Sequence, residues 1–165
     1  MSISGPLSHF ARDAQSFTTF VQSGCELGLN ELSKLASLIA ILCARAYSLP
    51  EITGEGSETL PELDKSSQER LAKELAARLP QDLYVTIDPL EVYSDVAPTV
   101  GQLSDDLADI WVEVEVGLRS WRQGGHQAQS LAGWHWRFTF HSHWGFHAVN
   151  ALAVLNALIR RTRNS

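Results

Sequence analysis

Hydrophobic residues recur at every third or fourth position along most of this chain, a spacing typical of amphipathic helices. Four such segments precede a pair of glycines, at residues 6–22, 30–49, 66–79 and 104–123. A longer segment, from about residue 127 to 160, follows the glycines and ends in arginines, which suit the negative end of a helix dipole. This order predicts an all-α, up-and-down bundle of about five helices with a long C-terminal helix, in which residues 1–165 form a single domain.

Two segments lack the helical spacing. Residues 50–64 carry prolines, glycines and acidic side chains but no basic one, which predicts a flexible acidic loop. The stretch near 80–100 contains Pro89 and Pro98, and its strand-like run at residues 83–87 has no evident pairing partner. We therefore expect an extended crossing segment there and not a sheet. Ser104 is expected to cap the helix that follows.

Composition narrows the classes of partner. The formal net charge of −6, from 13 basic and 19 acidic residues, argues against nucleic acid and anionic membranes as partners, because both need a basic surface. Cys25 and Cys43 lack metal-site or redox spacing and are predicted to be reduced thiols. Because no leader sequence or spanning apolar run is evident, we expect a cytoplasmic location. The cofactor, if one is used, is unknown from the sequence.

The most informative segment is 134–147, which contains three tryptophans, three phenylalanines and four histidines. Aromatic rings in this number are expected to be buried, and buried imidazoles need hydrogen-bond or metal partners. At about 100° per residue along a helix, His143 and His147 point inward. His135 and His141 fall well off that arc and are expected at the surface or rim.

A tight Gly-Gly turn makes the fourth and fifth helices antiparallel neighbours. Both helices rise by the same distance per residue, and they run in opposite directions. A residue of one helix therefore lies opposite a residue of the other when their two sequence numbers add up to about 250. Asp106 comes level with His143 and His147, which predicts a contact between a carboxylate and an imidazole. Glu113 comes level with Arg137, which predicts an ion pair.

The leading interpretation is a small helical binding or interaction protein with a pocket between the fourth and fifth helices. Aromatic rings would form its walls, and a few convergent polar groups would orient a small molecule or a peptide. The candidate ligand-binding residues are Tyr84, Asp106, Asp109, Trp136, Arg137, Phe140, His143, Trp144 and His147.

A second interpretation is a metal-dependent hydrolase. Two histidines four residues apart on a helix, with a nearby carboxylate, can bind a first-row divalent ion, and Asp106, His143 and His147 are the candidate ligands. The spacing alone is a weak signal, because Trp144 stands where the familiar metalloprotease helix has a glutamate. The sequence therefore assigns no catalytic residue and leaves open whether the protein is an enzyme.

Two further interpretations need no ligand. The buried histidines would hold two helices in register through hydrogen bonds to Asp106 and the tryptophan indoles, or the faces of Trp111 and Trp121 would bury against another copy. Gly145 lies mid-helix, where glycine is unfavourable by about 1 kcal/mol, so we expect another backbone or a ligand to approach it closely.

Three motifs carry a resemblance to a known family. They are Leu103-Ser104-Asp105-Asp106-Leu107-Ala108-Asp109-Ile110, Gly117-Leu118 and Trp134-x-Trp136-Arg137-Phe138-x-Phe140-x-x-His143-Trp144-Gly145-x-His147. With Tyr84, Asp88-Pro89 and Tyr47-x-Leu49-Pro50 upstream, the chain resembles a bacterial family catalogued as domain of unknown function 5063 over nearly its whole length. The resemblance implies a helical, cytoplasmic protein and brings no assigned activity. One departure is Trp111, which stands where the family's Asp-Ile-Tyr pattern has a tyrosine.

Overall fold

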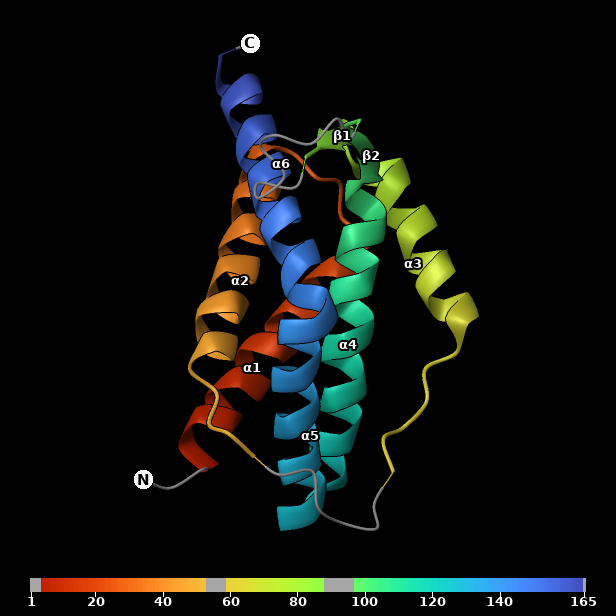
Figure 1. Cartoon of the computed structure of the whole chain (residues 1–165). Helices are drawn as coiled ribbons and strands as arrows, with labels where there is room; N and C mark the ends of the chain where they lie inside the picture. Colours follow the sequence, from red (N-terminus) through yellow and green to blue (C-terminus); the bar gives the residue numbers. More distant parts are fainter. Residues whose placement is uncertain (1–3, 53–58, 88–96, 165) are drawn as a thin grey trace.

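The first two helices pack against each other as an antiparallel pair. The computed structural model describes residues 4–52, 59–87 and 97–164. Helix α1 spans Ser4–Val21 and helix α2 spans Leu29–Tyr47 (Figure 1). Each turns one apolar stripe into the core, with fully buried side chains such as Phe10 and Phe17 on α1 and Leu35 and Ile39 on α2.

Helix α4 and the C-terminal helices complete the bundle. Helix α4 covers Leu103–Gln123, and the chain then reverses at Gly124 and Gly125, both at positive φ. Three consecutive helical parts return alongside it: α5 (His126–Thr139), a π-helical turn (Phe140–Trp144) and α6 (Gly145–Arg163), together called the C-terminal rod (Figure 1). The bounds of the helices agree with the predicted segments to within three residues, and the all-α bundle is confirmed.

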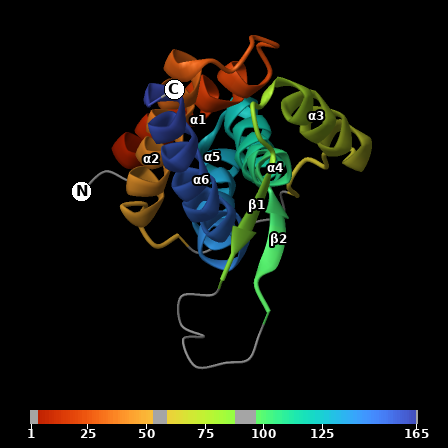
Figure 2. The ribbon, with the colours of Figure 1, turned by 90° about the horizontal axis from the view of Figure 1, so that it is seen from above.

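Helix α3, Lys65–Arg78, lies on the outside of the bundle against α4 (Figure 2). Only Leu71 and Leu75 of this helix are buried, which is the narrow stripe expected of a peripheral helix. Arg78 ties its end to the bundle, since it donates hydrogen bonds of 2.6 Å and 2.8 Å to the carbonyls of Cys25 and Val21. Part of the predicted acidic loop, residues 53–58, lies outside the described residues.

The expectation that residues 83–87 form an unpaired crossing segment is wrong. Strand β1, Leu83–Thr86, pairs antiparallel with strand β2, Thr99–Gln102, in a two-stranded sheet (Figure 2). The partner was missed because β2 has one apolar residue, Val100, and therefore no hydrophobic run to detect. The rest of the crossing segment, residues 88–96, lies outside the described residues.

The start of α4 is also capped differently from the prediction. The helix begins at Leu103, and Ser104 lies in its first turn and is not the cap. Asp82, which precedes β1, accepts hydrogen bonds from the Ser104 amide at 2.7 Å and from its hydroxyl at 2.9 Å. The carboxylate that precedes β1 thus satisfies one free amide of the helix, that of Ser104, and this contact fixes β1 against α4.

The π turn changes the phase of the C-terminal rod. A uniform α-helical count places His143, His147 and Val154 on the inward face. At these three positions the buried residue is instead the next one along the chain, Trp144, Ala148 and Leu155 respectively. Ala151 and Leu158, which the same count also places inward, are buried as predicted. A π turn contains one residue more than an α turn, so the inward face moves by one residue after it.

Gly145 closes the π turn. Its amide donates to the carbonyl of Phe140, five residues earlier, and a Cβ at Gly145 would lie 2.3 Å from that oxygen. The expected approach of a separate backbone segment is therefore wrong, because the crowding atoms belong to the same rod. Glycine is required here by the turn itself.

Candidate functional site

A row of carboxylates on α4 faces the histidines of the C-terminal rod. Asp106, Asp109 and Glu113 are three and four residues apart, so they share one side of α4. The antiparallel arrangement of the rod brings His143 and His147 opposite them. The cluster lies where the two elements meet, and its side chains range from buried to half-exposed.

His147 lies between two of these carboxylates. Its Nδ1 is 2.7 Å from Oδ1 of Asp106, and its Nε2 is 3.4 Å from Oδ2 of Asp109. The predicted contact between Asp106 and an imidazole is thus confirmed. The hydrogen bond with Asp106 raises the pKa of His147 against the effect of burial, and the negative charges of Asp109, Asp106 and Asp105 add to the increase.

Glu113 lies between the other two histidines. Its Oε1 is 3.0 Å from Nδ1 of His143, and its Oε2 is 3.0 Å from Nε2 of His135. Burial opposes ionisation of Glu113, but the hydrogen bonds and charges of His135 and His143 outweigh it and lower the pKa of this carboxyl.

Three expectations about this region are wrong. Glu113 does not pair with Arg137, whose Nη1 lies 3.9 Å from Oε1 of Glu51. His135, expected at the surface, is buried. His143, expected to point inward, has 44% of its side chain exposed. The π turn accounts for His143, and the carboxylate of Glu113 accounts for His135, because it provides a buried imidazole with a partner.

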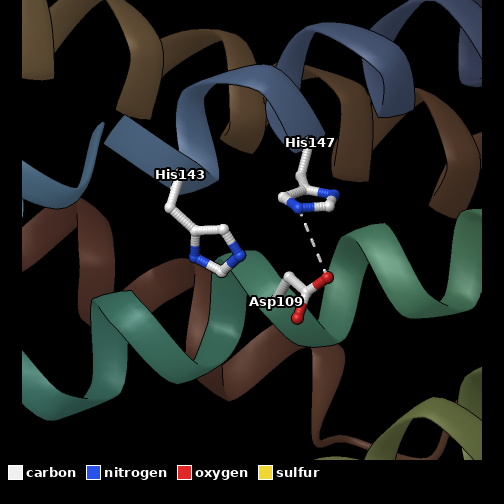
Figure 3. A group of neighbouring side chains, drawn as sticks. All are labelled: Asp109, His143 and His147. Carbon is white, nitrogen blue, oxygen red and sulfur yellow. Dashed lines mark ion pairs between the residues drawn. The ribbon is translucent and has the colours of Figure 1, made fainter. Parts of the chain in front are cut away.

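Asp109, His143 and His147 form a group that could hold a metal ion. One ligand atom from each lies within 4.8 Å of the other two. Figure 3 shows both rings pointing from the rod toward the Asp109 carboxylate on α4. Because Glu113 and Asp106 hold the Nδ1 atoms, the Nε2 atoms are the ones presented to Asp109. The sequence had proposed Asp106 as the third ligand, but Asp106 lies on the opposite nitrogen of His147.

Two residues outside the bundle orient the carboxylates. Gln68 of α3 donates a 2.5 Å hydrogen bond to Oδ1 of Asp109, and Tyr84 of β1 donates a 2.5 Å hydrogen bond to Oδ2 of Asp106. Tyr84 lies across Gly101 of β2, where a Cβ would come within 2.5 Å of its ring. Gln68 was not among the predicted site residues, and no local signal in the sequence marks it.

The comparisons with known proteins show the family and the fold of the chain. A family model described as a domain of unknown function, DUF5063, matches residues 2–160. The chain belongs to this family. A crystal structure of protein BF1032 from Bacteroides fragilis is similar, with a TM-score of 0.79 and 20% identity over 93% of this chain and 92% of that chain. At that identity the likeness shows a shared fold and nothing finer. No curated protein matches the chain.

The aromatic residues of segment 134–147 differ in their burial. Trp136, Phe140 and Trp144 lie in the core, whereas Phe138 and Phe146, which were expected to be buried, are 56% and 62% exposed. Trp136 and Trp144 are fully buried, and their indole nitrogens donate to the carbonyls of Val114 at 3.0 Å and Trp136 at 3.2 Å. Phe140 packs edge-on against Trp144, with ring centroids 4.6 Å apart. The hydrogen bonds of these residues are thus satisfied within the chain, and their proposed contact with a ligand stays a prediction.

The predicted docking face for a second copy is not available at Trp111. This side chain is 4% exposed and belongs to the core of its own chain. Its indole nitrogen is buried without a hydrogen-bond partner among the described residues. Trp121 is partly buried against Trp136.

In the part of the chain that the structure describes, no helix is long and apolar enough to cross a membrane.

Proposed function

We propose that this protein binds one first-row divalent metal ion through Asp109, His143 and His147. The observation that carries the proposal is the direction of the two imidazoles. Each engages a carboxylate through Nδ1, Glu113 in one case and Asp106 in the other. Such pairing fixes the tautomer with Nε2 as the electron-pair donor, and it is the usual arrangement of histidines that ligate metals.

The donor set matches the chemistry of a first-row ion. Two imidazole nitrogens and one carboxylate oxygen suit Zn²⁺, Fe²⁺ or Co²⁺ better than Ca²⁺ or Mg²⁺, which prefer oxygen alone. Ligand atoms around a tetrahedral zinc are about 3.4 Å apart, which follows from zinc–ligand bonds of about 2.1 Å. The 3.4 Å between His147 and Asp109 already has this value, and the ligand atom of His143 lies within 4.8 Å of both.

The local charge also favours a cation. Asp105, Asp106, Asp109 and Glu113 bring four carboxylates to one side of α4. Burial raises the pKa of Asp105, and the charges of Asp109, Asp82 and Asp106 raise it further. A metal ion among these groups would offset their repulsion.

Three protein ligands would leave a coordination position for water or a substrate. Since His143 is 44% exposed, that position would be accessible from solvent. A divalent ion in such a site can polarise a carbonyl or activate water, which is the chemistry of a metal-dependent hydrolase. Asp106 and Glu113 would keep the two imidazoles oriented, and Gln68 would hold Asp109 through its other oxygen.

The test is metal analysis of protein purified without a metal-affinity column, followed by Zn²⁺ and Co²⁺ titration of chelator-treated protein. We expect one ion per chain in the wild type, and in the cobalt form an absorption spectrum of a nitrogen- and oxygen-bound ion. Removing only the hydrogen-bond partner of a ligating histidine lowers metal affinity about 10–100-fold. Removing the histidine itself, in His143→Ala or His147→Ala, should therefore lower the affinity by more than that. Asp109→Asn should weaken binding in the same assay.

His141→Ala is the matched control. His141 lies in the same π turn and is exposed, but it is not in the metal-ligand group. This variant should bind the metal like the wild type. The proposal is overturned if the wild type binds neither ion at micromolar concentration, or if His143→Ala and His147→Ala retain stoichiometric binding. Circular dichroism would confirm that each variant is folded.

A further inference from the structure

A groove lies between β1 and α6. Figures 1 and 2 show these two elements side by side near the C-terminal end of α6. Its volume is about 640 Å³, within the range of small-molecule sites. The hairpin forms one wall and α6 the other. The apolar lining includes Leu83, Val85, Val100, Ala153, Val154 and Ala157.

The hairpin wall exposes apolar side chains that nothing in the described structure covers. Leu83 is 56% exposed, Val85 65% and Val100 64%. On α6, Ala153 and Ala157 are too small to fill the space opposite them. An apolar surface concentrated at a cavity is a common mark of a binding site, because leaving it in water costs free energy.

The two ends of the groove differ in charge. The inner end holds Tyr84 and Asn150, and Tyr84 contacts the Asp106 carboxylate. The outer end holds Gln81 and Arg161, which are joined by a 3.0 Å hydrogen bond. Arg161 therefore gives the outer end a positive charge in a protein whose net charge is −6, while Arg160 and Arg163, in the same last turn of α6, are not among the lining residues.

We propose that this groove binds a small amphiphilic anion with a single apolar chain. The chain lies between Val85 and Ala157, and the anionic head lies at the basic end of α6, near Arg161. The acidic neighbourhood of Tyr84 disfavours the reverse orientation, because Asp106 would repel an anion there. The proposal concerns a second site and stands whether or not Asp109, His143 and His147 bind a metal.

Decanoate, kept below its micelle concentration, is the probe. Its binding to the full-length protein is measured by calorimetry and by displacement of 1-anilinonaphthalene-8-sulfonate fluorescence. Ala157→Phe puts an aromatic ring into the groove and should weaken decanoate binding about tenfold or more, because the site has no room for both. Ala153→Phe tests the same wall if Ala157→Phe does not fold.

Ala44→Phe is the matched control, since Ala44 is exposed on α2 and does not line the groove. It should bind decanoate like the wild type. Decyltrimethylammonium has the same chain with a positive head and should bind more weakly than decanoate. The proposal is overturned if the groove-filling variants bind decanoate normally or if the cationic probe binds equally well. It is also overturned if light scattering shows a dimer that Ala157→Phe dissociates, because a second copy would then occupy the groove.

Discussion

Gly117 on α4 is where a single methyl group should do the most damage to the framework of the site. A Cβ there would lie 2.1 Å from Nε1 of Trp136, the atom that donates a 3.0 Å hydrogen bond to the carbonyl of Val114. Trp136 is fully buried and cannot swing away. Gly117→Ala must therefore displace either the ring or the α5 backbone, and with it the alignment of α4 and the C-terminal rod.

Three contributions set the loss of stability expected for Gly117→Ala. Overpacking a core costs about 1–3 kcal/mol. Breaking a buried hydrogen bond costs about 1–3 kcal/mol more, because a buried donor and acceptor lose their partners. Alanine regains about 1 kcal/mol over glycine as a helix former. The net loss is about 3 kcal/mol, and for a domain of this size the melting temperature should fall by about 6–12 °C.

Gly5→Ala provides the opposite expectation. Gly5 also lies in a helix, but a Cβ there meets no atom within 4 Å, so this variant should equal or slightly exceed the wild type in stability. Urea unfolding followed by circular dichroism, together with thermal melts, would measure both variants. A Gly117→Ala protein as stable as the wild type would refute the reasoning, because it would mean that the packing around Trp136 yields without cost.

Two other predictions concern the histidines. Glu113→Gln should weaken Zn²⁺ binding about 10–100-fold by loosening His143, whereas Glu69→Gln on the exposed face of α3 should not change it; equal affinities in a zinc titration would contradict this. In metal-free protein the pKa of His147 is raised in the folded state. Its ion pair with Asp106 therefore contributes fully to stability below about pH 6.5, the ordinary pKa of histidine. This contribution is lost as the pH rises through the pKa of the folded state. Urea midpoints between about pH 6 and pH 8.5 should therefore fall more in the wild type than in His147→Asn, and parallel pH curves would count against the interaction.

Much of the fold followed from periodicity. The spacing of apolar residues gave the helices, and the Gly-Gly break gave the antiparallel pairing of α4 with the C-terminal rod. Equal rise along two straight rods was then enough to place His147 opposite Asp106. These inferences hold because helix geometry is nearly invariant and a two-glycine turn leaves few alternatives.

The error about the direction of His143 comes from the π turn, a local feature that hydrophobic periodicity does not reveal. The π turn shifts the inward face by one residue, so Trp144 is buried where His143 had been expected. Asp109 consequently replaces Asp106 as the carboxylate facing both Nε2 atoms. The spacing of Asp106, Asp109 and Glu113 on one side of α4 was visible in the sequence and was the one signal that could have indicated this arrangement.

Tyr84 belongs to both regions of interest, because it lines the groove and its hydroxyl donates a hydrogen bond to Asp106. Asp106 in turn bonds to the imidazole that faces Asp109. A ligand in the groove that tilts the Tyr84 ring therefore alters the support behind His147. Thermodynamic linkage makes this coupling reciprocal. If a ligand in the groove changes the dissociation constant of the metal ion by some factor, the metal ion changes the dissociation constant of that ligand by the same factor.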